Sequence, residues 1–257
     1  MIAAANLDPS LAETVRAMED REEPFAFATV IRTAGSTAAK PGTKAILSAK
    51  GDIISGWLGG GCTRAAVRKA TLAAVADGQP KLISVAPEED LSHAPGSEVE
   101  GVHYARNGCP SKGTVDIFIE PSIPAPELVI FGASPVAQAL TNLAPGFHWS
   151  VSETAPADTL QLPTRRRFVV VATQGQGDRD ALTKALDAGA DYIGFVGSAR
   201  KFAALSEKLI ATGRTPEELA RVTAPTGLDI GAITPDEIAL AIMAEITRER
   251  RKAAKVA

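Results

Sequence analysis

The chain has 257 residues, of which 45% are hydrophobic and 22% charged, and its formal net charge is -3. This composition is typical of a globular protein of one or two domains, and the slight negative charge argues against a nucleic-acid partner. Two cysteines, Cys62 and Cys109, cannot make a disulfide framework or a four-cysteine zinc site. The chain shows neither an apolar run as long as a membrane span nor a signal peptide, so we expect a cytoplasmic protein with free thiols.

The first half of the chain predicts a mixed α/β domain. Residues 8–20 form a helix with Asp8 as N-cap and Pro9 at the first helical position, and residues 63–78 form a helix that Gly78 ends. Strands are expected at 24–33, 81–86 and 113–121, with two more inside 44–59 joined by a turn at Lys50-Gly51-Asp52. Residues 87–112 are polar, contain proline and glycine, and predict a long irregular loop.

Three prolines between Pro121 and Pro126 predict a linker, because proline interrupts helices and central strands. We therefore expect one domain at 1–122, with both cysteines, and a second at 127–257. Strands and helices alternate in the second half, which predicts a Rossmann-like, parallel, doubly wound sheet. The expected strands are 127–133, 148–154, 167–173 and 191–197, and the expected helices are 134–144, 177–189, 198–213, 215–222 and 234–253.

One strand-to-helix turn in the second half, at residues 132–137, occupies the place of a dinucleotide-binding fingerprint. Gly132 matches its first glycine, whereas Ser134 replaces the second, where the backbone normally approaches a pyrophosphate. Glu153, about 20 residues further on, could reach a ribose hydroxyl. A nucleotide site and a merely tight strand–helix connection are both compatible with this turn.

Two later loops follow strands at the edge where such sheets bind ligands. One contains Thr173, Gly175 and Gly177, which offer a hydroxyl and flexible backbone. The other begins at Ser198 and places Arg200 and Lys201 in the first turn of a helix, where cations oppose the helix dipole. That placement favours an anionic ligand, although ordinary solvated charges remain an alternative.

Cys62 follows Gly59, Gly60 and Gly61 and directly precedes a predicted helix. The glycines allow a sharp turn and an open approach to the thiol, and a helix N-terminus stabilises a thiolate. This pattern favours a thiol that reacts, carries sulfur or binds a metal, although most free cysteines are simply small buried hydrophobes. Cys109 also lies in a glycine-containing turn, and neither cysteine has a CxxC partner. His93 and His103 could supplement a metal site, but each is interpreted first as a solvated loop side chain.

Taken together, these segments resemble the XdhC/CoxI family, whose members help to mature molybdenum hydroxylases such as xanthine dehydrogenase and carbon monoxide dehydrogenase. The resemblance covers nearly the whole chain, and the GASP turn and TQGQGD loop are similar to those of the CoxI/CoxF-like branch. Where the later cysteine motif of the family commonly reads CGG, this chain reads CPSKG. The segments that carry the resemblance are 28–47, 55–67, 108–121, 128–140, 191–201 and 224–246.

The resemblance implies an N-terminal α/β domain, a Rossmann domain, and a chaperone for the molybdenum cofactor, bound as molybdopterin or its cytosine dinucleotide form. It implies a molybdenum hydroxylase apoenzyme as partner and a cysteine desulfurase as sulfur donor. Cys62 would carry or receive sulfur, or contact molybdenum, and Cys109 would assist. The residues expected to hold the pterin phosphate are Ser36, Thr37, Lys40 and Lys44. Gly132, Ser134, Glu153, Gly175 and Ser198 would hold a nucleotide.

Two other functions are compatible with the sequence. The chain could be an oxidoreductase that uses NAD(P) or FAD at the Rossmann edge, with Cys62 as its reactive thiol, or an interaction scaffold that binds neither ligand. A homodimer is expected because symmetric pairs are the commonest oligomers.

Overall fold

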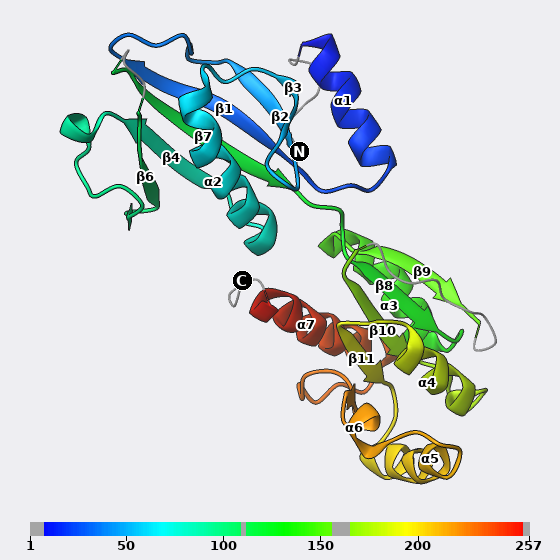
Figure 1. Cartoon of the computed structure of the whole chain (residues 1–257). Helices are drawn as coiled ribbons and strands as arrows, with labels where there is room; N and C mark the ends of the chain where they lie inside the picture. The colour runs from blue at the N-terminus through cyan, green and yellow to red at the C-terminus, as the bar shows by residue number, and fades with distance from the viewer. Residues whose placement is uncertain (1–7, 109–111, 156–164, 254–257) are drawn as a thin grey trace. The chain divides into compact units, whose positions relative to one another are not determined.

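The computed structural model describes residues 8–108, 112–155 and 165–253, apart from the side chains of residues 62 and 253. The chain divides into two compact units, unit 1 ending at Pro124 and unit 2 running from Ala125 to Lys252 (Figure 1). Unit 1 has a mixed sheet and unit 2 a parallel one, so the predicted fold class is confirmed. That residues 1–122 and 127–257 each fold as a separate domain stays a prediction.

Unit 1 is built on a seven-stranded sheet with the order β3-β2-β1-β7-β4-β6-β5, in which only the β4–β6 pair is parallel. Its strands are β1 (Phe25–Ala34), β2 (Lys44–Ser48), β3 (Ile53–Gly56), β4 (Lys81–Ala86), β5 (Glu98–Val99), β6 (Val102–Arg106) and β7 (Thr114–Ser122). Its helical segments are α1 (Pro9–Asp20), η2 (Gly61–Thr63), α2 (Arg64–Asp77) and η3 (Glu88–Asp90).

The two helices of unit 1 cover opposite faces of its sheet. Phe25 and Phe27 of β1 belong to the apolar cluster that includes Val15 of α1, whereas Ala26 and Ala28 belong to the cluster of α2. This division follows from the two-residue repeat of a strand, which sends successive side chains to opposite faces. The capping predictions for both helices are confirmed: Asp8 accepts a hydrogen bond from the Ser10 N–H at 2.9 Å, and Gly78 ends α2 at φ +69°.

The structure differs from the sequence prediction at two places in unit 1. The stretch 87–112 contains β5 and β6, so the expectation of a wholly irregular loop is wrong. Strand β6 forms by pairing with β4, and no local sequence pattern reveals that partner. Strand β7 also runs through Pro121 to Ser122, into the expected linker. Pro121 is tolerated because β4 pairs with β7 only up to Ile119, so β7 has a single neighbour beyond that point.

Unit 2 is built on a five-stranded sheet with the order β12-β11-β10-β8-β9, in which every pair is parallel. Its strands are β8 (Glu127–Phe131), β9 (Ser150–Thr154), β10 (Arg167–Val171), β11 (Tyr192–Phe195) and β12 (Val222–Thr223). Its helical segments are α3 (Pro135–Leu143), η4 (Ala144–Phe147), α4 (Asp178–Asp187), α5 (Ala199–Ala211), α6 (Pro216–Leu219) and α7 (Pro235–Ala253). In the described part of the chain, no helix has both the length and the apolar character needed to cross a membrane.

Helices cover both faces of the unit 2 sheet, as the doubly wound prediction requires (Figure 1). Leu128 and Ile130 of β8 pack in the cluster of α3 and α7, while Val129 and Phe131 pack in the cluster of α4 and α5. The expected helix at 215–222 is wrong at its end: α6 is a single turn, and Val222 pairs with β11 as the start of β12.

Candidate functional site

Three loops meet at one end of the unit 1 sheet. The loop 35–43 follows β1, and it approaches both residues 112–113 before β7 and the segment that precedes η2. A Cβ added to Gly113 would collide with the Ser36 carbonyl, and one added to Gly59 would lie 3.1 Å from the Ala39 Cβ. Ser36 is therefore close to Gly113, directly before β7, while Ala39 is close to Gly59 before the turn that carries Cys62. Cys109 itself lies outside the described residues.

The structure places Cys62 in η2, directly before α2. Gly60 is the residue that caps this turn, and the Thr63 hydroxyl donates a hydrogen bond to its carbonyl at 3.1 Å. The first helical residue after the turn, Arg64, is exposed. The side chain of Cys62 is not among the described atoms, so its reactivity stays a prediction.

The glycines before Cys62 do not all serve the same purpose. Gly59 has φ +108°, which favours glycine, whereas Gly60 has φ -69° and extended backbone that any residue can adopt. A Cβ on Gly60 or Gly61 would meet no atom within 4 Å. The sharp turn therefore requires a glycine only at position 59. At positions 60 and 61 the space that a side chain would occupy is open.

Two of the four residues expected to hold a phosphate make side-chain hydrogen bonds within unit 1. Lys44 lies in β2, where its Nζ donates to the Thr29 hydroxyl at 3.0 Å. The Thr37 hydroxyl accepts the Ala39 N–H at 3.2 Å. Ser36 and Lys40 are exposed. Two of the four residues are thus engaged within unit 1, and the assignment of all four as phosphate ligands stays a prediction.

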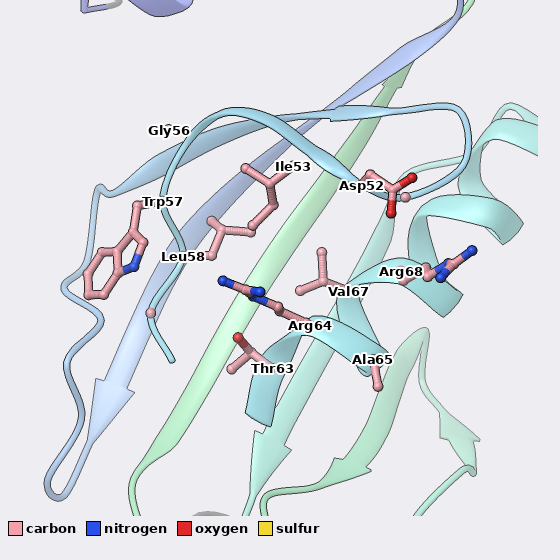
Figure 2. A pocket seen from close by; sticks show the side chains of 12 residues that line it. Asp52, Ile53, Gly56, Trp57, Leu58, Thr63, Arg64, Ala65, Val67 and Arg68 are labelled. Carbon is pink, nitrogen blue, oxygen red and sulfur yellow. The ribbon is translucent and has the colours of Figure 1, made fainter. Parts of the chain in front are cut away.

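Beside η2 lies a cavity of about 660 Å³ that the sequence analysis missed (Figure 2). It is bounded by the β2–β3 turn, by Trp57 to Gly59, and by the first turns of α2. Trp57 is 47% exposed, which is unusual for a large aromatic side chain. A tryptophan two residues before a run of three glycines was the available signal in the sequence.

In unit 2, the turn before α3 packs tightly on the end of β10. A Cβ on Gly132 would lie 2.6 Å from the Ala172 carbonyl oxygen and 2.7 Å from the Thr173 Cα, and Gly132 has φ +109°. Glu153, near the end of β9, is exposed and pairs with Ile130 of β8. The turn, Glu153 and the loop after β10 therefore meet where the strand order reverses, which is where sheets of this kind bind ligands.

The hydroxyl groups at this edge are already hydrogen-bonded. Ser134 Oγ accepts the Ala137 N–H at 3.2 Å, and Ser198 Oγ accepts the Lys201 N–H at 3.2 Å. The Thr173 hydroxyl donates to Asp178. Pro135 has no N–H, so of the first three residues of α3 only Val136 keeps a backbone donor for a ligand. Because Ser134 and Ser198 only accept in these bonds, each keeps its O–H to donate to a ligand, whereas the Thr173 proton is directed to Asp178.

Lys201 is paired rather than free for an anion. Its Nζ lies 2.6 Å from Asp178 Oδ2, and Gly175 donates its N–H to the other carboxylate oxygen at 3.3 Å. Burial alone would raise the pKa of Asp178, but the hydrogen bonds from Lys201 and Thr173 lower it below its ordinary value. The unfavourable position of Lys201 at the start of α5 is therefore explained by Asp178, with no need for an anionic ligand.

His93 is exposed, in agreement with its interpretation as a solvated loop side chain, whereas His103 lies in β6 and is half-buried. The His93 ring lies 4.9 Å from that of Tyr104, and His103 Nδ1 lies 3.5 Å from the Glu98 carboxylate. Over residues 8–108, 112–155 and 165–253, no three His, Cys, Asp or Glu side chains come close enough together to hold a metal ion.

Two family models match this chain. The model of the XdhC and CoxI family matches residues 18–86, and that of the XdhC Rossmann domain matches residues 128–246. The chain belongs to the XdhC/CoxI family. The first match contains β1 and the Cys62 turn, and the second contains the parallel sheet of unit 2 up to α7.

Three curated relatives are similar to this XdhC/CoxI chain. YqeB of Escherichia coli K12, named an uncharacterized protein, is 29% identical over 260 residues, which cover 92% of this chain and 45% of YqeB. A Bacillus subtilis 168 protein, named as a probable subunit of xanthine dehydrogenase, is 32% identical over 167 residues, covering 56% of this chain and 48% of that protein. The molybdenum cofactor insertion chaperone PaoD of E. coli K12 is 28% identical over 130 residues, covering 49% and 41%. The matches thus span less than half of each relative.

Proposed function

We propose that this chain is an accessory chaperone that binds the molybdenum cofactor, supports its sulfuration and inserts it into a molybdenum hydroxylase apoenzyme. Membership of the XdhC/CoxI family and the similarity to PaoD, a protein named as a molybdenum cofactor insertion chaperone, support this proposal. The structural observation that supports it is the position of residue 62 at the start of the η2–α2 helical segment, next to Gly60 and Gly61, at which an added Cβ would meet no atom within 4 Å.

Cys62 is the residue to which we assign the central chemistry. Cys62 lies at the N-terminal end of the continuous η2–α2 helical segment, where the partial positive charge of the helix stabilises a thiolate. A thiolate is the form that accepts or passes on sulfur and that binds metals. In this proposal Cys62 carries or receives sulfur, or contacts molybdenum, and Cys109 assists.

The remaining assignments complete the proposal. A cysteine desulfurase supplies the sulfur, and the cofactor is molybdopterin or its cytosine dinucleotide form. The edge of unit 2, with Gly132, Ser134, Glu153, Gly175 and Ser198, holds the nucleotide of the cofactor or a separate nucleotide. The chain acts as a homodimer.

The test is a Cys62→Ala variant expressed in cells that lack the wild-type copy, with the activity of the molybdenum hydroxylase client as readout. We expect the variant to remain folded, by circular dichroism, and to lose client activation. Lys69→Ala, which removes an exposed cation from the same helix, is the matched control and should activate the client fully. Full client activity with Cys62→Ala would refute the role of this thiol.

The molecules that co-purify with the chain under anaerobic conditions distinguish the proposed chaperone from an oxidoreductase. The proposed chaperone retains a pterin, detected by mass and by the fluorescence of its oxidised form. Tight binding of a nicotinamide or flavin without any pterin would instead support an oxidoreductase, and binding of neither would support a scaffold.

A further inference from the structure

The cavity beside η2 is shaped by close contacts between backbone segments. At Gly51, in the β2–β3 turn, an added Cβ would lie 2.7 Å from Arg68 Cγ and 2.8 Å from Arg68 Cα. The turn therefore rests directly on the backbone of α2 and sets the width of the cavity at that end. At the other end, Gly59 turns the chain at φ +108° against Ala39. The volume of the cavity, about 660 Å³, lies within the usual range for small-molecule sites.

The interior of this cavity combines an apolar floor with an accessible aromatic wall. Leu58 and Val67 are 1% and 2% exposed and form the floor, whereas Trp57 and Ile53 are 47% and 36% exposed. Figure 2 shows Trp57 at one end of the cavity and the side chains of Ile53, Leu58 and Val67 between it and the other end. An indole in this position offers a flat surface on which a planar ring can stack.

Two guanidinium groups give this cavity its charge. Arg64 and Arg68 are four residues apart and so share one face of α2. Both are exposed, and neither has a hydrogen-bond or ion-pair partner within the described parts of the chain. Asp52, the only carboxylate in the lining, lies with Arg68 at the end away from Trp57 (Figure 2). Arginine binds phosphate through paired N–H groups, so this charge favours a phosphate-bearing ligand.

We propose that this cavity binds a planar heteroaromatic ring that carries a phosphate, with the ring against Trp57 and the phosphate on Arg64. Arg68, which Figure 2 shows turned to the opposite end near Asp52, adds positive charge there. The identity of the ligand rests on the proposed function: molybdopterin has both a pterin ring and a phosphate. Gly59, two residues before η2, and Thr63, the last residue of η2, also line the cavity, so the ligand lies beside the position of Cys62. The cavity then replaces the loop at Ser36 to Lys44 as the principal phosphate site.

The test uses the full chain, produced in a bacterial host that makes the molybdenum cofactor and purified anaerobically, with bound pterin measured per chain. Trp57→Ala and the double variant Arg64→Ser/Arg68→Ser should each retain at least tenfold less pterin than the wild type. Trp57→Phe, which keeps an aromatic face, should retain most of it. Lys69→Ser removes a cation from α2 outside the cavity and should bind as the wild type does. Circular dichroism and thermal melting establish that each variant is folded.

A second measurement distinguishes a pterin from an ordinary nucleotide. Wild-type chain without pterin is titrated with cytidine monophosphate, FMN and inorganic phosphate while tryptophan emission is followed, and Trp57→Phe identifies the signal of Trp57. Nucleotide binding that is lost in the cavity variants, without any pterin retained by the wild type, would support the cavity and count against the proposed function. Equal pterin retention by wild type and cavity variants would overturn the cavity assignment while leaving the proposed function intact. A wild type that binds neither pterin nor nucleotide would overturn both.

Discussion

The contact between the turn before α3 and the end of β10 predicts a large effect for Gly132→Ala. The φ of +109° is costly for a residue with a Cβ, by about 1–2 kcal/mol. The added Cβ would also lie 2.6 Å from the Ala172 oxygen and 2.7 Å from the Thr173 Cα, both backbone atoms that cannot rotate away. Overpacking of this kind costs about 1–3 kcal/mol, so the free energy of unfolding of unit 2 should fall by roughly 2–5 kcal/mol.

Substitutions at two other glycines of unit 2 separate the cost of the backbone conformation from the cost of overpacking. Gly175 has φ +95° but no atom within 4 Å of an added Cβ, so Gly175→Ala should lose only the backbone contribution, about 1–2 kcal/mol. Gly146, in η4, has neither a positive φ nor a neighbour within 4 Å. Gly146→Ala should therefore leave stability unchanged, or raise it by about 0.5 kcal/mol through the unfolded state.

The assay is urea denaturation followed by the fluorescence of Trp149, in a chain that carries Trp57→Phe. Trp149 is then the only tryptophan, and it reports on unit 2 because it is 4% exposed and its ring lies 4.8 Å from that of Phe168. Midpoints should fall in the order Gly146→Ala, Gly175→Ala, Gly132→Ala, the last being lowest. If Gly132→Ala and Gly175→Ala agree within about 0.5 kcal/mol, the collision with β10 is absent and the reasoning is wrong.

Three further predictions concern hydrogen bonds of unit 2. Asp178→Asn should cost about 1–3 kcal/mol at pH 7, by loss of the charged pair with Lys201. The pKa of Asp178 is lowered below its ordinary value of 3.8 in the folded chain. The destabilisation by Asp178→Asn should therefore be complete above pH 3.8 and should shrink as the pH falls through the folded pKa. A destabilisation that grows in acid would contradict the pairing. Tyr192→Phe removes a buried hydroxyl that donates to Glu245 at 2.7 Å, and should lower the free energy of unfolding by about 1–3 kcal/mol; an unchanged urea midpoint would show the bond to be unimportant. Thr215→Ala breaks a reciprocal capping box and should cost about 1 kcal/mol, whereas Thr215→Ser should cost much less, and equal losses would argue against the cap.

The helices and long strands could be predicted because their signals are local. Asp8 and Pro9 mark the start of α1, and Gly78 marks the end of α2. Each of these residues acts through the backbone conformation or hydrogen bond at its own position. The short strands β6 and β12 could not, because Val102 and Val222 become strand residues only by pairing with distant partners, Leu82 and Ile193. Two consecutive residues such as Val222 and Thr223 carry no periodicity of their own.

The candidate site was predictable in part for the same reason. The sequence pointed to Cys62 through its glycines and the following helix, both of which are near it in the chain. It could not reveal the cavity, because Gly51 and Arg68 are far apart in sequence and meet only through the packing of the β2–β3 turn on α2. It also could not show that Asp178 would pair with Lys201, which belongs to a different helix.

The pairing of β1 with β7 also determines where unit 1 is tethered. Phe25 pairs with Ser122 at one end of the two strands, and Ala34 pairs with Thr114 at the other, beside the loops that surround η2. The chain therefore enters and leaves the sheet at the end remote from those loops, separated from them by nine residues of β7 or about 26 Å. A substitution near Ser122 therefore acts at the opposite end of the paired strands from the loops around η2, and the nine residues of β7 lie between the two.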